Sequence, residues 1–519
     1  MKRVKFVLGL CLLFGGLTLL AACGSSSGAT SVTDQESKGA AESEETGEST
    51  EGHEGLVYTG PGMCLDCHSD EAADMFDSTH YQLQGEALYM TEGPSLQGKI
   101  SGAVNTYCGN ITGNWAGCSA CHVGRGQVPD LNMSQSQLAN IDCLICHQKE
   151  YKRISVDGVM VPDTDNMAIS MDQAVQSVHL PVRANCLGCH AKAGGADAVK
   201  RGDLALATAA TTDRNYDIHM ATTGANLRCQ SCHTTENHHI AGKGSDLRPT
   251  DLDVSVECSN CHGRSPHSNS DINQHLAAVA CQSCHIPVYA KNAGDSAADE
   301  ATEIDRSWQA GSEHVSPPLH PVLTKANNLI PEYRFWNRYS SNYLLGDVAL
   351  LDAETGAYAT SRPQGDINDG KLYPFKYKTS DYPLRIVSQE LIPLDTSVFF
   401  ASADADAAAR AGLVNMGYSA SDAYEWVTID TYQLLNHQVS PEEQALRCTD
   451  CHLNTARMDL QGKLGYAPSR PQSTCATACH SSSKANEWRF GDWEEFTEYH
   501  KKHVDEKGAD CIDCHGFDR

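Results

Sequence analysis

One short pattern, C-x-x-C-H, recurs nine times in this chain of 519 residues and constrains it more than any other feature. Two thiols at this spacing, followed at once by a histidine, attach c-type haem, and the histidine becomes an axial ligand of the iron. Zinc sites also use paired cysteines, but they do not require a histidine directly after the second cysteine nine times over. The motifs are Cys64-Cys67-His68, Cys118-Cys121-His122, Cys143-Cys146-His147, Cys186-Cys189-His190, Cys229-Cys232-His233, Cys258-Cys261-His262, Cys281-Cys284-His285, Cys448-Cys451-His452 and Cys511-Cys514-His515.

A tenth attachment site is expected at Cys475, Cys479 and His480, where one extra residue separates the two thiols. The alternative is a coincidental pair of cysteines. The cysteine count of 23 supports the tenth site, because ten haems use all but three of the thiols. Of those three, Cys11 and Cys23 belong to the N-terminal segment, and Cys108 remains. The expected cofactor is therefore haem c, in about ten covalently attached copies.

The histidine count of 23 leaves thirteen histidines outside the motifs, enough to give most irons a second imidazole. Ligation by two histidines suits low-potential electron transfer. Any one of these residues could instead be an ordinary surface or core histidine. His500 and His503, which are three residues apart, share one face of a helix expected over 493–507. The expected distal ligands are His80, His219, His239, His267, His275, His437, His500 and His503.

The first residues direct the chain out of the cytoplasm. Basic residues, an apolar stretch and small residues form a signal peptide over 1–22, too short to span a bilayer comfortably. The run L-A-A-C then predicts a lipidated Cys23, the alternative being a plain signal peptide with an accidental cysteine. Residues 23–55 are poor in apolar side chains and read as a flexible acidic tether. We therefore expect an outer-membrane lipoprotein on the periplasmic or cell-surface side.

The spacing of the motifs divides the rest of the chain into three regions. Seven motifs fall within 56–285, a haem-free wrap and the eighth motif occupy 286–470, and a dihaem extension forms 471–519. So dense a haem array replaces much of an apolar core. The expected fold is mainly α with extensive loops, a multihaem cytochrome c wrapped around a haem chain with little β-sheet. Within the wrap we expect a helix over 401–413 and an aromatic segment, 333–343, packed on haem.

An ordered set of motifs resembles the octahaem tetrathionate reductases. The set begins with the first motif, S-T-H80 and G-K99, and includes the unpaired Cys108 and C-H-V-G-R-G. It continues through I-D-C-L-I-C-H, C-L-G-C-H-A-K-A-G-G-A-D-A-V-K200-R-G-D-L, D-I-H219-M and H-H239-I-A-G, and ends at C-T-D-C-H and L-G-Y466. The dihaem extension, the lipid anchor and the acidic tether depart from the family pattern.

The resemblance implies an active-site haem at the second motif, with Lys200 as its distal ligand and Cys108 beside it. A lysine binds iron only as the neutral amine, which burial favours. A thiol beside the haem could exchange with a sulfur substrate. Without the resemblance, a surface lysine and a buried free cysteine would be the ordinary interpretations. Four further residues could attract an anion: Arg125, Lys152, Lys192 and Arg201.

The net charge of the chain limits the classes of partner that it can bind. A formal net charge of -27 argues against nucleic-acid binding and requires a locally basic site for any anionic substrate. Expected partners are other redox cytochromes or an extracellular acceptor, a small anionic substrate, the membrane through the lipid and, left open, further copies of the chain. Two functions remain: a reductase of tetrathionate, nitrite or hydroxylamine at the second haem, or an electron conduit or filament subunit at the outer surface.

Overall fold

The computed structural model describes residues 52–113, 115–242, 251–312, 316–452 and 454–466, together with 501, 502 and 506. All of these belong to one unit of the chain, residues 41–519. The predicted signal peptide, Cys23, most of the tether, the motifs at 475–480 and 511–515, and His500 and His503 lie outside them. Within the described part, no helix is both long and apolar enough to cross a bilayer.

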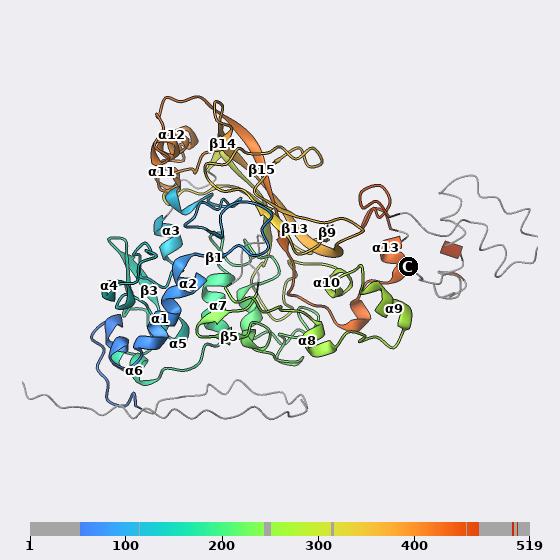
Figure 1. Ribbon diagram of the computed structural model, residues 1–519. Helices are drawn as coiled ribbons and strands as arrows, with labels where there is room; N and C mark the ends of the chain where they lie inside the picture. Colours follow the sequence, from blue (N-terminus) through green and yellow to red (C-terminus); the bar gives the residue numbers. More distant parts are fainter. Residues whose placement is uncertain are drawn as a thin grey trace, which may run out of the picture. The chain divides into compact units, whose positions relative to one another are not determined.

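Each attachment motif within the described residues closes a single helical turn. In the first motif the backbone N–H of His68 donates to the carbonyl of Cys64 at 2.8 Å, and the same bond recurs in the second, third, fifth and sixth motifs. Because residues three and four apart share a helix face, this turn brings both sulfurs and the imidazole to one side. Many helices are therefore short pieces built around a motif (Figure 1).

The described helices are, in chain order, η1 Pro61–Asp66, α1 Ser69–Asp77, α2 Thr79–Gln82, η2 Ile111–Gly113, α3 Trp115–Ser119, α4 Gln135–Leu138, α5 Leu144–His147, α6 Met171–Gln176, α7 Arg183–His190, η3 Leu206–Ala209, η4 Cys229–Ser231, α8 Ser259–His262, α9 Ser270–His275, α10 Cys281–His285, α11 Thr396–Ser402, α12 Ala405–Asn415, η5 Glu442–Gln444 and α13 Cys448–His452. The helix expected over 401–413 is divided in two. Ala403 adopts a left-handed backbone (φ 57°), and the side chain of Asp404 then caps α12 by accepting from the N–H of Ala407.

The expectation of little β-sheet is wrong. The strands are β1 Gln84–Glu86, β2 Leu96–Gly98, β3 Arg153–Val156, β4 Val159–Pro162, β5 Thr235–Glu236, β6 His239–Ile240, β7 Thr302–Ser312, β8 Pro321–Ala326, β9 Glu332–Trp336, β10 Ser340–Asn342, β11 Tyr358–Ala359, β12 Ser361–Pro363, β13 Lys371–Arg385, β14 Glu390–Leu391 and β15 Tyr424–Leu434. Seven of them form one mixed sheet in the order β11-β15-β13-β7-β8, with β9 and β14 also paired to β13. The region predicted as a haem-free wrap therefore contains an extended sheet.

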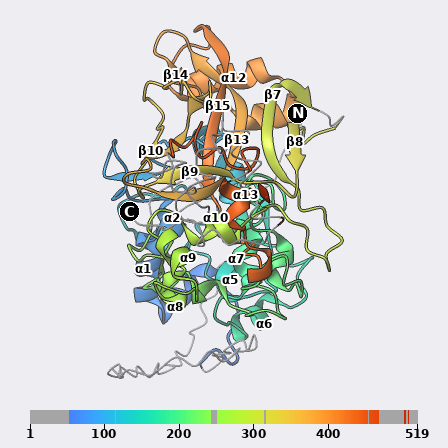
Figure 2. The same cartoon turned by 90° about the vertical axis from the view of Figure 1, so that its right-hand side faces the viewer.

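The centre of this sheet is the antiparallel pair β13 and β15, in register from Phe375 opposite Leu434 to Arg385 opposite Tyr424. Figure 2 shows β7 and β8 as a second pair of adjacent strands, and β7 joins β13 in parallel at Thr379 and Ser380. The segment 333–343, expected to pack on haem, supplies most of β9 and all of β10, and its residues Trp336 and Arg338 line the cavity described below.

A core forms where α11 and α12 pack against the sheet. Trp308 and Phe399 meet edge to face with ring centroids 4.9 Å apart, and Ala409 and Ile429 join the same buried cluster. This arrangement gives the second half of the chain an apolar core that does not depend on a prosthetic group. The sheet can therefore act as a rigid wall for the motif-bearing half.

Candidate active site and haem array

Seven of the eight described motif histidines face a second histidine ring. Metal–imidazole bonds of about 2 Å on both sides of an iron, plus about 1 Å from each nitrogen to its ring centre, place two axial rings about 6 Å apart. The observed ring-centroid distances lie between 5.9 and 6.4 Å. The pairs are His53–His68, His80–His190, His147–His238, His219–His262, His233–His437, His267–His285 and His275–His452.

The space between these rings also fits haem. The second to seventh motifs line one connected cavity of about 3610 Å³, several times the roughly 300–1,000 Å³ of an ordinary ligand pocket. Burial lowers the pKa of the motif imidazoles His122, His147, His233 and His285, and lowers that of His190 to about 3. Neutral imidazole is the form that binds a metal, so burial favours ligation. The residues present therefore match covalently attached haem with two axial imidazoles.

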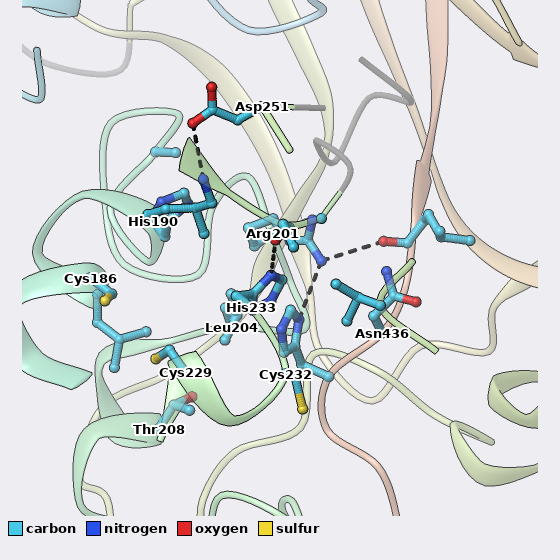
Figure 3. A pocket seen from close by; sticks show the side chains of 18 of the residues that line it. Cys186, His190, Arg201, Leu204, Thr208, Cys229, Cys232, His233, Asp251 and Asn436 are labelled. Carbon is cyan, nitrogen blue, oxygen red and sulfur yellow. Dashed lines mark hydrogen bonds between the residues drawn. The ribbon is translucent and has the colours of Figure 1, made fainter. Parts of the chain in front are cut away.

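Sulfur contacts order the attachment sites in space. Motif sulfurs are hydrogen-bonded between the first and third motifs, the fourth and fifth, and the sixth and seventh. Electrostatic contacts of motif thiols connect the third to the fourth, the fifth to the sixth, and the seventh to the eighth. The second motif joins this series at the fourth, through Cys121 and Cys189. Figure 3 shows one step, with Cys186 beside Cys229 and with His190 and His233 at the cavity.

The pairings differ from the expected distal set at two points. His238, not the predicted His239, faces His147, and the ring of His239 instead lies 3.0 Å from a carboxylate oxygen of Asp251. Asn237 and His238 both have positive φ, as the two central residues of a tight hairpin between β5 and β6 require. His53, which was not selected from the sequence, faces His68. The structure places the other five described candidates, His80, His219, His267, His275 and His437, against motif histidines.

Asp203 orients one distal histidine. Its carboxylate accepts from Nδ1 of His437 at 3.1 Å and from the backbone N–H groups of Asn436 and His437. Arg201 donates to the same carboxylate through two nitrogens, at 2.8 and 2.7 Å. Carboxylates that hold a metal-binding imidazole in this way fix its orientation and raise its basicity. The sequence analysis did not select Asp203, although it stands in the R-G-D-L segment that the resemblance included.

We expect Asp203→Asn to loosen the ligation at the His233–His437 site. Partners of this kind contribute about 10- to 100-fold to metal affinity, so the variant should show a stronger high-spin haem signal than the parent protein. Electron paramagnetic resonance of the fully haem-loaded protein measures this signal. Asp197→Asn is the matched control, because that carboxylate accepts only a backbone N–H, that of Leu206, among the bonds seen in the described residues. Identical spectra for the two variants would contradict a role for Asp203 in ligation.

The second motif is the exception among the described motifs. Among the residues that the structure describes, no second histidine ring faces His122; its neighbours are the rings of Tyr81 and Trp115, with centroids 5.4 and 5.5 Å away. Nε2 of His122 lies 2.7 Å from the carbonyl oxygen of Tyr81. The thiol of Cys118 is within electrostatic range of Lys99, Cys108 and Lys200. The two catalytic candidates therefore gather at the motif whose ligand set differs from the rest.

Cys108 is held on a tight turn. Asn105 accepts from the backbone N–H groups of Tyr107 and Cys108 through its side chain, and its own N–H donates to the carbonyl of Gly109. Gly109 has φ 74°, and a Cβ there would lie 1.6 Å from the hydroxyl of Tyr382, so only glycine fits. The turn presents Cys108, partly exposed, to the cavity.

Lys200 lies across the cavity on the segment that follows α7. Its carbonyl accepts from Nζ of Lys376 at 2.9 Å and from the hydroxyl of Tyr107 at 3.2 Å, which ties this segment to the Cys108 turn. Lys376 also donates to the Tyr107 hydroxyl, at 3.1 Å. Lys376 belongs to β13, so the sheet fixes the two candidate residues relative to each other.

A charged triad on the sheet lies behind the Cys108 turn. Arg306 of β7 donates to both carboxylate oxygens of Glu303 at 2.9 and 2.7 Å, and Lys378 of β13 lies 3.1 Å from the same carboxylate. Burial lowers the pKa of Lys378 to about 8, which leaves its ammonium largely charged at pH 7. Burial works to raise the pKa of Glu303, but Arg306 and Lys378 hold it below its ordinary value. The triad therefore keeps two cations and one anion.

The four cationic residues proposed from the sequence divide into two groups. Lys192 and Arg201 line the cavity, although Arg201 is bound to Asp203. Arg125 and Lys152 do not line it and instead donate to the backbone carbonyls of Met160 and Asn166. Lys99 and Arg306, which the sequence analysis did not propose for this role, also line the cavity. Lys99 could have been predicted only from the G-K99 segment of the family resemblance, and no sequence pattern indicated Arg306.

Comparisons with known proteins agree with this geometry. Residues 63–148 match the family model described as cytochrome c554 and c-prime, and residues 320–455 match the one described as cytochrome c bacterial. An uncharacterized protein from Archaeoglobus fulgidus is 30% identical over 36% of this chain and 77% of the relative. The crystal structure of an octaheme cytochrome c from Shewanella oneidensis is 30% identical, with a TM-score of 0.67, over 81% of this chain and 97% of that one. The chain therefore belongs to the tetrathionate-reductase-like family of octahaem cytochromes c that its ordered motifs predicted, and it transfers electrons through covalently attached haem c.

Proposed function

We propose that this protein is an extracytoplasmic reductase that reduces a small sulfur or nitrogen substrate, namely tetrathionate, nitrite or hydroxylamine, at the second motif. The observation that carries the proposal is the difference between this motif and the other seven described ones. His122 faces no second imidazole among the described residues, while Cys108 and Lys200 border the cavity beside Cys118. A site built only to relay electrons would need neither residue.

The residues of the second motif divide the chemistry between them. Cys118, Cys121 and His122 would hold a haem that would supply electrons and an iron coordination position. Lys200 lines the cavity beside this motif, where it would bind the iron as the neutral amine or give a proton to a departing product as the ammonium. Lys99 and Arg306 at the cavity wall attract an anion.

Cys108 suits tetrathionate best. Its thiolate can attack a central sulfur of tetrathionate, which breaks the central S–S bond, releases one thiosulfate and leaves the other half bound to Cys108 as a mixed disulfide. Reduction of that disulfide by two electrons, which bound haem would supply, would release the second thiosulfate and restore the thiolate of Cys108. The sum is one tetrathionate and two electrons converted to two thiosulfates.

A second candidate function is an electron conduit or filament subunit at the cell surface. The observation that favours it is the series of neighbouring motifs from the first to the eighth, three of whose links are sulfur hydrogen bonds and the other three electrostatic contacts. About ten haems, a lipid at Cys23 and partner cytochromes or an extracellular acceptor would fit this role equally well. The two functions are compatible, because a conduit can carry a reactive side site.

Turnover by the purified, fully haem-loaded protein tests the proposal. With a reduced viologen dye as donor, we expect rapid oxidation by at least one of tetrathionate, nitrite and hydroxylamine, with two thiosulfates formed per tetrathionate. A sample without the protein measures the direct reaction of the dye. Oxidation by iron oxide or an electrode alone, with none of the three substrates consumed, would overturn the reductase and leave the conduit.

A further inference from the structure

The buried triad of Glu303, Arg306 and Lys378 is not required to attach or ligate haem, and none of its members belongs to a motif. The side chain of Lys378 is fully buried and that of Arg306 is 4% exposed, yet both are charged groups. Burying charge is costly unless it is paired, and here two cations share one carboxylate. One positive charge therefore remains uncompensated within the triad, and its position relative to Cys108 indicates its role.

All five N–H groups of Arg306 donate hydrogen bonds, two of them to Glu303 and three to residues around the candidate active site. Besides Glu303, the guanidinium donates to the carbonyl of Tyr107 at 3.0 Å, to the sulfur of Cys108 at 3.6 Å and to the carbonyl of Gly194 at 3.1 Å. Gly194 belongs to the segment that leads to Lys200, so one cation touches both sides of the site.

Lys378 adds its charge from directly behind the turn. Its ammonium lies 4.5 Å from the centre of the Tyr107 ring and donates to the carbonyl of Thr106 at 2.6 Å. It does not line the cavity, so a substrate would experience it only as an electric field. Asp305 also acts on Lys378 through space, but that carboxylate accepts from the hydroxyl of Thr379.

We infer that Glu303, Arg306 and Lys378 form a specificity element that holds one net positive charge beneath the Cys108 turn and thereby selects anionic substrates. The inference rests on the proposed reductase function and names the substrate class of that site. Glu303 sets the size of the field, because it cancels one of the two cations. The protein's formal net charge of -27 makes such a local field necessary for an anion to bind.

Two isosteric or near-isosteric variants change this field in opposite directions. Lys378→Met removes one positive charge, and we expect KM for nitrite to rise about threefold and KM for the doubly charged tetrathionate about tenfold. Glu303→Gln removes the negative charge, and both KM values should fall by similar factors. At pH 7, where Lys378 is largely charged and hydroxylamine is largely uncharged, KM for hydroxylamine should stay unchanged in both variants. The double variant restores the net charge and should return KM toward that of the parent protein.

A purely structural role predicts a different pattern, because loss of packing impairs the site in the same direction in both variants and for all substrates. Equal KM changes for charged and uncharged substrates, or a rise in KM for both variants, would therefore overturn the inference. If Lys378→Met fails to fold, as judged by its haem spectrum, Glu303→Gln alone still decides, because only a field effect lowers KM for an anion. Failure of the reductase proposal is distinct: the parent protein would then turn over none of the three substrates.

Discussion

Lys200→Ala and Cys108→Ala should each lower the turnover of viologen-reduced protein by about 100-fold or more, the scale of losing a proton donor or a covalent nucleophile. The two residues border the cavity at the second motif, and the structure ties their segments together through Tyr107 and Lys376. Cys108→Ala should affect tetrathionate most, because only that substrate needs sulfur exchange. Lys200→Ala should affect all three substrates. Initial rates with each substrate measure both effects.

Lys152→Ala is the matched control for this experiment. Lys152 is also a cation of the N-terminal half, but its Nζ donates to the carbonyl of Asn166 and it does not line the cavity. We expect its rate to equal that of the parent protein. If Lys200→Ala and Cys108→Ala kept full activity in samples with intact haem spectra, the reaction would not take place at the second motif.

The chain made without covalent haem should fail to fold in its motif-bearing half. A void in a protein interior costs about 24 cal/mol per Å³, and even a tenth of that over 3610 Å³ is comparable to the roughly 5–15 kcal/mol that stabilises a domain. We expect far-ultraviolet circular dichroism to show no cooperative melting of this half, and trypsin to digest it within the time that leaves the haem-loaded protein intact.

The haem-loaded protein at the same concentration and buffer is the control for this comparison. The cluster of Trp308, Phe399 and Ile429 does not line the cavity, so residual structure in the sheet would be consistent with the prediction. A haem-free chain that melts cooperatively throughout, with protease resistance equal to the loaded form, would contradict it.

The attachment motifs could be identified from the sequence because their chemistry is local. Two sulfurs and an imidazole occupy one helical turn, and the spacing alone specifies that turn. Distal histidines are set by tertiary structure instead. His238 and His239 are adjacent in sequence, and only the left-handed backbone of the β5–β6 hairpin decides that His238 meets His147. The segment carrying His53 is likewise polar and gave no pattern that pointed to His68.

The sheet could not be predicted because its buried face is not apolar. In β13 the even-numbered residues from Leu372 to Leu384 are buried, but Lys376, Lys378 and Ser380 stand among them. The alternation of apolar and polar residues that identifies a strand is therefore lost. Two prolines, Pro374 and Pro383, further weaken the pattern. Lys376 and Lys378 contact the Cys108 turn, and Lys376 also contacts the Lys200 segment, so the residues that obscured the strand pattern also position the candidate site.

The position of the second motif beside the other motifs would affect how quickly electrons can reach it. Cys121 meets Cys189, while the remaining described motifs form a continuous line past that point. In the proposed function, the haem of the second motif would therefore be a branch from this line of haems, not a link within it. Charge stored along the line in advance can be drawn on in quick succession when substrate arrives, so a multi-electron reduction need not wait for each electron to be delivered from outside. An inhibitor bound at the second motif would leave electron transfer along the other haems unaffected.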